Sequence, residues 1–213
     1  MHQIINLLTK VAERYAPSRV LSFDQGHVFK AMQIMEEKKK TSRKALMYDL
    51  GLGEGVVKTM VKHMKMNRLV ENSNAGMWLT PRGKIMYLKL RTVIAGEIDI
   101  PKCSVALGKF NHAVLVRGFA YTVKTGIEQR DIAIRHGAIG ATTLVFKDDK
   151  LMMPGKNLDS LRKEPKICEL VITSLKPENE DIIIIVSADD KRTAEMAAKD
   201  TALQIISDHE RHF

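Results

Sequence analysis

Apolar residues change their spacing close to residue 96, and this change divides the chain into two regions of different fold. Before it, apolar residues recur at the three- and four-residue intervals of amphipathic helices, for example over residues 57–64. After it, short aliphatic runs typical of β-strands alternate with helical segments. Residues 96–101 are polar, and they interrupt the helical pattern. We therefore predict an α+β protein with two domains, residues 1–95 and residues 96–213.

The first region has the order of elements found in a winged helix-turn-helix. Helices are expected at residues 1–16, 23–37, 54–66 and 81–91, with a short one to about residue 50 capped by Thr41 or Ser42. The glycines at 51 and 53 predict a tight turn, because glycine adopts positive φ without steric penalty. Residues 73–76 favour a hairpin turn between strands at 69–72 and 77–80. From residue 23 the order is helix, helix, turn, helix, hairpin, helix, which predicts a winged helix-turn-helix domain.

Two stretches also resemble known proteins. The stretch TSRKALMYDLGLGEGVVKTMVKHMKMNRLVENSNAGMWLTPRG is similar to the archaeal and bacterial winged helix-turn-helix regulators, whose wing usually ends in a Leu-Thr-Pro-Arg-Gly exit like that at residues 79–83. The stretch GIEQRDIAIRHGAIGATTLVFKDDKLMMPG resembles the second domain of archaeal winged-helix proteins. The resemblance implies an archaeal source, and it supports two domains. It implies no DNA target and no activity for the second domain.

Charge is divided unequally between the two regions. Residues 1–91 carry 17 Lys and Arg against 7 Asp and Glu, whereas residues 92–213 carry 17 against 18. The whole basic excess of the chain therefore lies in the first region. Such an asymmetry indicates a polyanionic partner for one domain, and we predict double-stranded DNA.

The helix at residues 54–66 is the expected recognition helix. Its three lysines lie four and three residues apart and so share one face. Glycines at its start would let a phosphate approach the backbone, where a helix N-terminus favours anions. The alternative is that these lysines are only a solvated helix face. The predicted DNA-binding residues are Ser42, Arg43, Lys44, Gly53, Gly55, Lys58, Thr59, Lys62 and Lys65.

The second region predicts a mixed α/β domain. Strands are expected at residues 104–107, 113–119, 142–146, 167–174 and 181–187, and helices at 127–136 and 191–209. The helix at residues 127–136 begins with backbone donors and an arginine that could bind an anionic ligand. The candidate ligand-binding residues are Gly126, Glu128, Gln129 and Arg130. The alternative is a surface helix whose acidic first turn offsets the helix dipole. Residues 187–190 follow a buried strand, where ligands often bind, but a helix cap explains the same residues and is the favoured interpretation.

No catalytic residue, metal site or cofactor is predicted. The sequence holds no GxSxG, Walker or HExxH motif, and its two cysteines, Cys103 and Cys168, form no CxxC pair. The longest aliphatic run, residues 182–186, is far shorter than the roughly 20 residues of a membrane helix. No signal-peptide pattern follows the N-terminus, so we expect a cytoplasmic protein without membrane contact.

These observations favour a DNA-binding transcriptional regulator over two other classes. The second domain would bind a small-molecule effector or control assembly. A homodimer is expected, with the first helix, the helix at residues 82–91 and the last helix as available surfaces. The alternatives are a protein-interaction adaptor that uses the winged helix as a binding module, and an enzyme built on the second domain.

Overall fold

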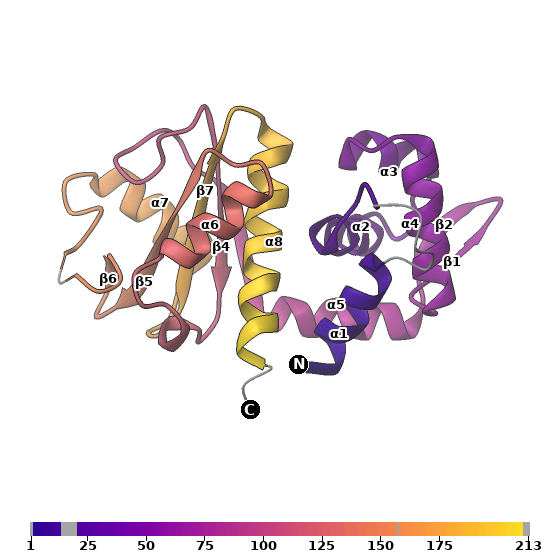
Figure 1. Ribbon diagram of the computed structural model, residues 1–213, viewed down its shortest axis with the longest axis horizontal. Coiled ribbons are helices and arrows are strands. Elements are labelled where there is room, and N and C mark those ends of the chain that lie inside the picture. The colour runs from indigo at the N-terminus through magenta and orange to yellow at the C-terminus, as the bar shows by residue number, and fades with distance from the viewer. Residues whose placement is uncertain (1, 14–20, 157, 211–213) are drawn as a thin grey trace. The chain divides into compact units, whose positions relative to one another are not determined.

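The computed structural model describes residues 2–13, 21–156 and 158–210, which fold into two compact units (Figure 1). Unit 1 is Met1–Leu90 and unit 2 is Arg91–Phe213, so the division lies five residues before the predicted boundary at 95/96. The mixed content of helix and strand agrees with an α+β protein. Within the described residues, no helix combines the length and the apolar character that a membrane span requires.

The described part of unit 1 combines five helices with one hairpin. Its elements are α1 (His2–Ala12), α2 (Gln25–Lys38), α3 (Arg43–Leu50), α4 (Glu54–Met66), β1 (Val70–Ser73), β2 (Gly76–Leu79) and α5 (Pro81–Val93), whose last turn belongs to unit 2. Local capping explains three helix starts, because side-chain oxygens of Asp24, Ser42 and Thr80 accept backbone N–H groups of α2, α3 and α5. Between α3 and α4, Gly51 adopts φ 68°, as the predicted turn requires.

The hairpin of unit 1 is tied to the segment that precedes α3. Strands β1 and β2 pair antiparallel from Val70 opposite Leu79 to Ser73 opposite Gly76. The backbone of Thr41 exchanges two hydrogen bonds with Met77 of β2, at 2.9 and 2.8 Å. Buried side chains from the helices and the hairpin fill the core of the unit, among them Phe29, Met32, Leu46, Val57, Met60, Met64, Leu69, Met77 and Leu90. The hairpin is thereby held beside α2 and α4 and next to the segment that leads into α3.

Unit 2 is a five-stranded sheet with helices on both faces. Its elements are β3 (Ile94–Asp99), β4 (Phe110–Val116), the 3₁₀-helix η1 (Ala120–Thr122), α6 (Ile127–Arg135), β5 (Gly140–Lys147), β6 (Lys150–Met152), α7 (Pro165–Leu175), β7 (Ile182–Ala188) and α8 (Lys191–Glu210). The strand order is β3-β4-β7-β5-β6, and every neighbouring pair is antiparallel. Helices α8 and α6 lie on one face, over β4, β7 and β5, whereas α7 packs on the opposite face (Figure 1).

Three predictions for unit 2 are wrong. Residues 167–174, predicted as a strand, lie in helix α7, which begins with Pro165 and buries Val171 and Leu175 one turn apart. Residues 104–107 are not a strand, because residues 104 and 105 form a turn closed by a bridge between Cys103 and Ala106. The polar stretch taken as a domain boundary contains most of β3, in which acidic residues alternate with residues that face the core.

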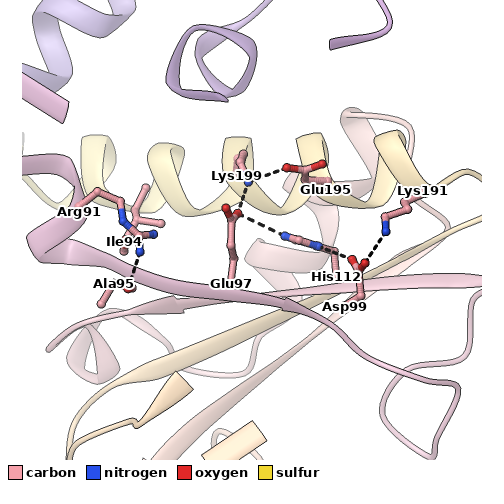
Figure 2. Close-up of polar contacts among 9 residues, drawn as sticks. All are labelled: Arg91, Ile94, Ala95, Glu97, Asp99, His112, Lys191, Glu195 and Lys199. Atoms are coloured by element: carbon pink, nitrogen blue, oxygen red, sulfur yellow. Dashed lines mark hydrogen bonds and ion pairs between the residues drawn. The ribbon is translucent and has the colours of Figure 1, made fainter. Parts of the chain in front are cut away.

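Helix α5 passes into β3 without a linker. Arg91 provides hydrogen bonds at this junction. Its guanidinium donates to the carbonyl oxygens of Ile94 and Ala95 at 3.1 and 3.0 Å (Figure 2). The carbonyl groups near the helix end therefore find a partner within the same short segment.

Candidate nucleic-acid interface

Helix α4 presents a row of lysines to solvent. Lys58, Lys62 and Lys65 are exposed, while Val57 and Met60 on the other side of the helix are buried. Lys65 donates to Asn72 Oδ1 of β1 at 2.6 Å and so links the helix to the hairpin. For Lys58 and Lys62, no ion-pair partner exists among the residues that the structure describes. Two cationic groups of this face are therefore available to an anion from outside.

The start of α4 differs from the capped starts of α2, α3 and α5. Its N-cap is Gly53, and no side chain accepts the first backbone N–H groups within the described part of the chain. Gly53 has φ −66°, a conformation that any residue adopts. A Cβ atom built at Gly53 or at Gly55 would meet nothing within 4 Å. The fold of unit 1 therefore does not require glycine at either position, and the small residues leave the first amides of α4 open to a ligand.

The N-terminal residues of α3 add further positive charge. Ser42 caps the helix by accepting from the backbone of Ala45 at 3.1 Å, and Arg43 and Lys44 are exposed. Arg43 Nη1 lies 3.9 Å from Glu54 Oε1, so the starts of α3 and α4 are close together. This exposed ion pair contributes little stability, yet it partly offsets the one acidic residue at the start of α4.

Thr59 has a narrower role than its sequence position suggests. Its hydroxyl donates to the carbonyl of Gly55 at 2.9 Å, so its hydrogen is already engaged. The oxygen can still accept from a donor, such as a base amino group, but it cannot donate to a phosphate. All nine predicted DNA-binding residues thus lie on α3, on α4 or at their N-caps, and eight of them are exposed; Thr59 is half-buried.

The three lysines that precede α3, Lys38, Lys39 and Lys40, contact other side chains of unit 1. Lys38 bridges Asp49 at 2.7 Å and Lys39 bridges Glu36 at 2.6 Å. Lys40 Nζ lies 5.8 Å from the ring centroid of Trp78 on β2, a cation–π distance. Two of these contacts, Lys38 with Asp49 and Lys40 with Trp78, join elements whose positions depend on the fold of the whole unit, so no local sequence pattern predicts them.

In unit 2, the predicted ligand residues separate into two cavities. Glu128 and Gln129 line a cavity of about 620 Å³. Its lining also includes the carboxylates of Asp131 and Asp208 and the basic side chains of Arg135 and His209. Arg130 instead lines a cavity of about 210 Å³ with Ser187, at the end of β7. Gly126 lines neither of the two and serves as the N-cap of α6 with φ 80°. The start of α6 is therefore not a single anion site.

Unit 2 also contains a buried network of charged side chains, which sequence analysis missed (Figure 2). Lys199 of α8 is fully buried, and its ammonium contacts the carboxylates of Glu97 on β3 and of Glu195, the latter at 3.0 Å. His112 of β4 continues the network, with Nε2 3.3 Å from Glu97 Oε2 and Nδ1 2.8 Å from Asp99 Oδ1.

Electrostatics explains the charge state of this network. Burial disfavours the ionised form of Glu97, but hydrogen bonds and charges of His112 and Lys199 outweigh it and hold the pKa of Glu97 well below its usual range. Burial likewise opposes ionisation of Asp99, whereas Lys191 and His112 favour it, so the pKa of Asp99 is also lowered. Both carboxylates are therefore ionised at neutral pH.

The same network has the donor set of a metal site. Single ligand atoms of Glu97, His112 and Glu195 lie within 4.8 Å of one another. The Lys199 ammonium already contacts both carboxylates, however, and supplies the positive charge that a metal ion would bring. The arrangement is best described as a buried ion-pair network that joins α8 to β3 and β4.

Comparison with known proteins finds two similarities, one for most of unit 2 and one for the chain as a whole. Residues 107–205 match the family described as Domain of unknown function (DUF4443). A solved structure titled "Hypothetical protein PH0730 from Pyrococcus horikoshii OT3" is similar over 88% of this chain and 95% of its own, with a TM-score of 0.72 and 23% sequence identity. No curated protein matches the chain. The likeness to the archaeal protein shows the fold, and neither match carries an activity.

Proposed function

We propose that unit 1 is a winged helix-turn-helix domain that binds double-stranded DNA, and that the protein is a transcriptional regulator. In this proposal α4 enters the major groove, and the exposed residues at the start of α3 contact the phosphate backbone. Strands β1 and β2 form a wing, whose turn residues Asn74 and Ala75 carry no charge and contribute little to binding. The order of the elements from α2 to α5 supports this assignment.

One observation carries the proposal: an exposed, unpaired row of cations lies beside an uncapped helix start. Lys58 and Lys62 have no ion-pair partner in the described part of the chain, and Gly53 and Gly55 leave the first amides of α4 accessible. If these lysines served only to keep the helix surface soluble, the uncapped N-terminus of α4 beside them would have no role. A phosphate group is bound well by the combination of free backbone N–H groups and nearby cations.

Unit 2 then serves regulation and assembly of a cytoplasmic homodimer. The cavity of about 620 Å³ lined by α6 and α8 is where a small-molecule effector would bind. Gln129, which lines this cavity, is 2% exposed, and its buried Oε1 lacks a hydrogen-bond partner among the described residues. A hydrogen-bond donor would satisfy that oxygen, and the three carboxylates of the lining favour a cationic ligand.

A second function is favoured by apolar residues on the surface of unit 1. Ile85 and Leu88 of α5 are each about half exposed, one turn apart. Such a pair suits a protein partner, and unit 1 would then be an interaction adaptor. Salt separates the two functions, because DNA binding through several lysines weakens steeply as salt rises.

The experiment is a titration of the full chain onto random-sequence duplex DNA, followed by fluorescence anisotropy at low salt. The test variant is Lys58→Ala/Lys62→Ala, and the matched control is Lys163→Ala/Lys166→Ala, which removes the same charge from exposed positions of unit 2. We expect the test variant to lose about tenfold or more in affinity, while the control stays close to the unchanged protein.

Two outcomes would overturn the proposal. Equal losses in both variants would mean that the affinity follows net charge and not the α4 face. No binding by the unchanged protein at low salt would make the adaptor function the leading one.

A further inference from the structure

Helix α6 of unit 2 has an outer face that no other part of the described chain covers. It consists of Ile127, Arg130, Asp131 and Ile134, which recur at the i, i+3, i+4 and i+7 spacing of one helix side. Ile127 is 50% and Ile134 46% exposed, and the charged pair between them is also exposed. The opposite side of the helix, with Gln129, Ile132 and Ala133, is buried on the sheet.

The order of residues on this α6 outer face is self-complementary. When two copies of the helix run antiparallel about a two-fold axis between residues 130 and 131, Ile127 of each copy meets Ile134 of the other. Arg130 then lies at the level of Asp131 of the second copy, and the reverse holds by symmetry. We propose that the α6 outer face binds the same face of a second copy of this chain.

The flanks of the helix fit the same arrangement. Glu128 and Arg135 are both exposed and lie near opposite ends of α6. Antiparallel pairing brings Glu128 of one copy near Arg135 of the other, so four further charges are matched by sign. Parallel pairing would instead set like charges against each other. The charges of the face therefore select the antiparallel two-fold arrangement.

An apolar rim next to α6 enlarges the surface. Leu107 and Ile139 are 69% and 58% exposed, and both line the cavity of about 210 Å³ that Arg130 also lines. This rim is thus continuous with the α6 outer face. Because a helix of nine residues is only about 13 Å long, the rim supplies apolar area that the helix alone lacks. The surface remains small, and we expect a dissociation constant of about 1–100 µM.

Net charge favours unit 2 as the place where copies meet. Unit 2 carries 18 basic and 18 acidic residues, whereas unit 1 carries 16 against 7. Two copies of unit 2 therefore do not repel each other strongly, while two copies of unit 1 would.

The three dimer surfaces expected from sequence fit less well. On α5, the exposed Ile85 and Leu88 are accompanied by exposed Arg82 and Lys89, so two copies would bring like charges together. Helix α8 packs on β4, β7 and α6 of its own unit, so one side of it is already occupied. Among the side chains of α1 that the structure describes, the exposed ones are Gln3, Asn6 and Lys10, and a row of this kind offers no apolar area.

Charge reversal on α6 tests the inference through the molar mass of the full chain in solution. Arg130→Asp and Asp131→Arg each place like charges against each other across the two-fold axis, and both positions are exposed, so the fold should tolerate them. We expect each variant alone to raise the dissociation constant by about a hundredfold. An equimolar mixture of the two restores opposite charges at the interface, and so does the double variant Arg130→Asp/Asp131→Arg.

At a protein concentration well above the dissociation constant of the unchanged protein and well below that of the single variants, sedimentation should therefore approach twice the 24.0 kDa chain mass for the unchanged protein, for the double variant and for the mixture, but give a monomer for each single variant. Ile134→Lys should also give a monomer, while Ile85→Lys, at a similarly exposed position on α5, should not change the mass. A monomeric unchanged protein, or a dimer that survives both single reversals, would overturn the inference. None of these readouts requires DNA, so a failure of DNA binding leaves the test intact.

Discussion

Lysine has opposite surroundings in the two units of this protein. On α4 of unit 1, Lys58 and Lys62 project into solvent and have no ionic partner among the described residues. In unit 2, Lys199 is fully buried between two carboxylates. A buried charge must be balanced nearby, or it destabilises the fold, whereas an exposed one is free to bind a polyanion. The comparison teaches that the position of each charge, and not the basic excess by itself, indicates function.

The largest expected effect comes from Lys199→Met. The substitution leaves Glu97 and Glu195 without their shared cation, and losing one partner of a buried ion pair costs about 3–5 kcal/mol of unfolding free energy. Chemical denaturation, with hydrogen exchange of β4 and β7 as the probe of unit 2, measures the loss. The matched substitution Lys62→Met should change stability by no more than about 0.5 kcal/mol. If both substitutions cost the same, the contrast between the two lysines is wrong.

As pH falls, unit 2 should lose stability before unit 1. The expected loss is smaller than that caused by Lys199→Met. The folded-state pKa values of Glu97 and Asp99 are lowered, so their contribution to stability is complete above the unfolded pKa of about 4 and is lost as pH falls below it. In unit 1 the only lowered carboxyl pKa among the described groups is that of Glu36, which makes only solvent-exposed ion pairs.

Each unit offers its own readout of this acid transition. The single tryptophan, Trp78, reports on unit 1 by fluorescence, and hydrogen exchange of β7 reports on unit 2. Glu97→Gln should flatten the pH dependence of unit 2 below pH 4 and leave the Trp78 signal unchanged. If unit 1 unfolded at a higher pH than unit 2 during acidification, the account would be contradicted.

Two glycines of unit 1 should respond in opposite directions to alanine. A Cβ atom at Gly83 would lie 2.1 Å from the carbonyl oxygen of Leu69, so Gly83→Ala forces a backbone shift and should cost about 2 kcal/mol or more. Gly55 has open space in that direction, and Gly55→Ala should stabilise the helix by about 0.5–1 kcal/mol. We expect Gly55→Ala to weaken DNA binding nevertheless. A variant that gained stability and kept its affinity would argue against phosphate contact at this helix start.

The smallest expected effect is that of Glu54→Gln. The variant removes an exposed ion pair with Arg43 and should alter stability by less than about 0.5 kcal/mol. It also removes the one acidic side chain at the start of α4, so affinity for DNA should rise about threefold at low salt. Anisotropy titrations of the two proteins side by side measure this gain, and a loss of affinity would mean that Glu54 contacts a base donor.

The sequence predicts unit 1 better than unit 2, for physical reasons. Local signals set the limits of α4, whose predicted and observed bounds coincide at residues 54–66, and of the hairpin, which differs by one residue. In unit 2, the mixed stretch at residues 167–174, with four aliphatic residues, fits a strand or a helix equally, and only Pro165 at the start of α7 favours the helix. The acidic residues of β3 indicate a loop until the sheet pairs them with β4.

The candidate sites follow the same division. The lysines of α4 lie within one helix, so their shared face follows from helical spacing. The network around Lys199 joins residues about 100 positions apart in sequence, and it depends on where α8 crosses the sheet. No local pattern contains that information.

The salt dependence of DNA binding tests the central claim most directly. The slope of log K against log salt concentration counts the phosphate contacts, and each lost contact reduces it by about 0.9 on duplex DNA. The account predicts that Lys58→Ala/Lys62→Ala lowers the magnitude of the slope by about 2, while Lys163→Ala/Lys166→Ala leaves it unchanged. A slope that is the same in the α4 variant and in the unchanged protein would show that this face of α4 does not contact DNA.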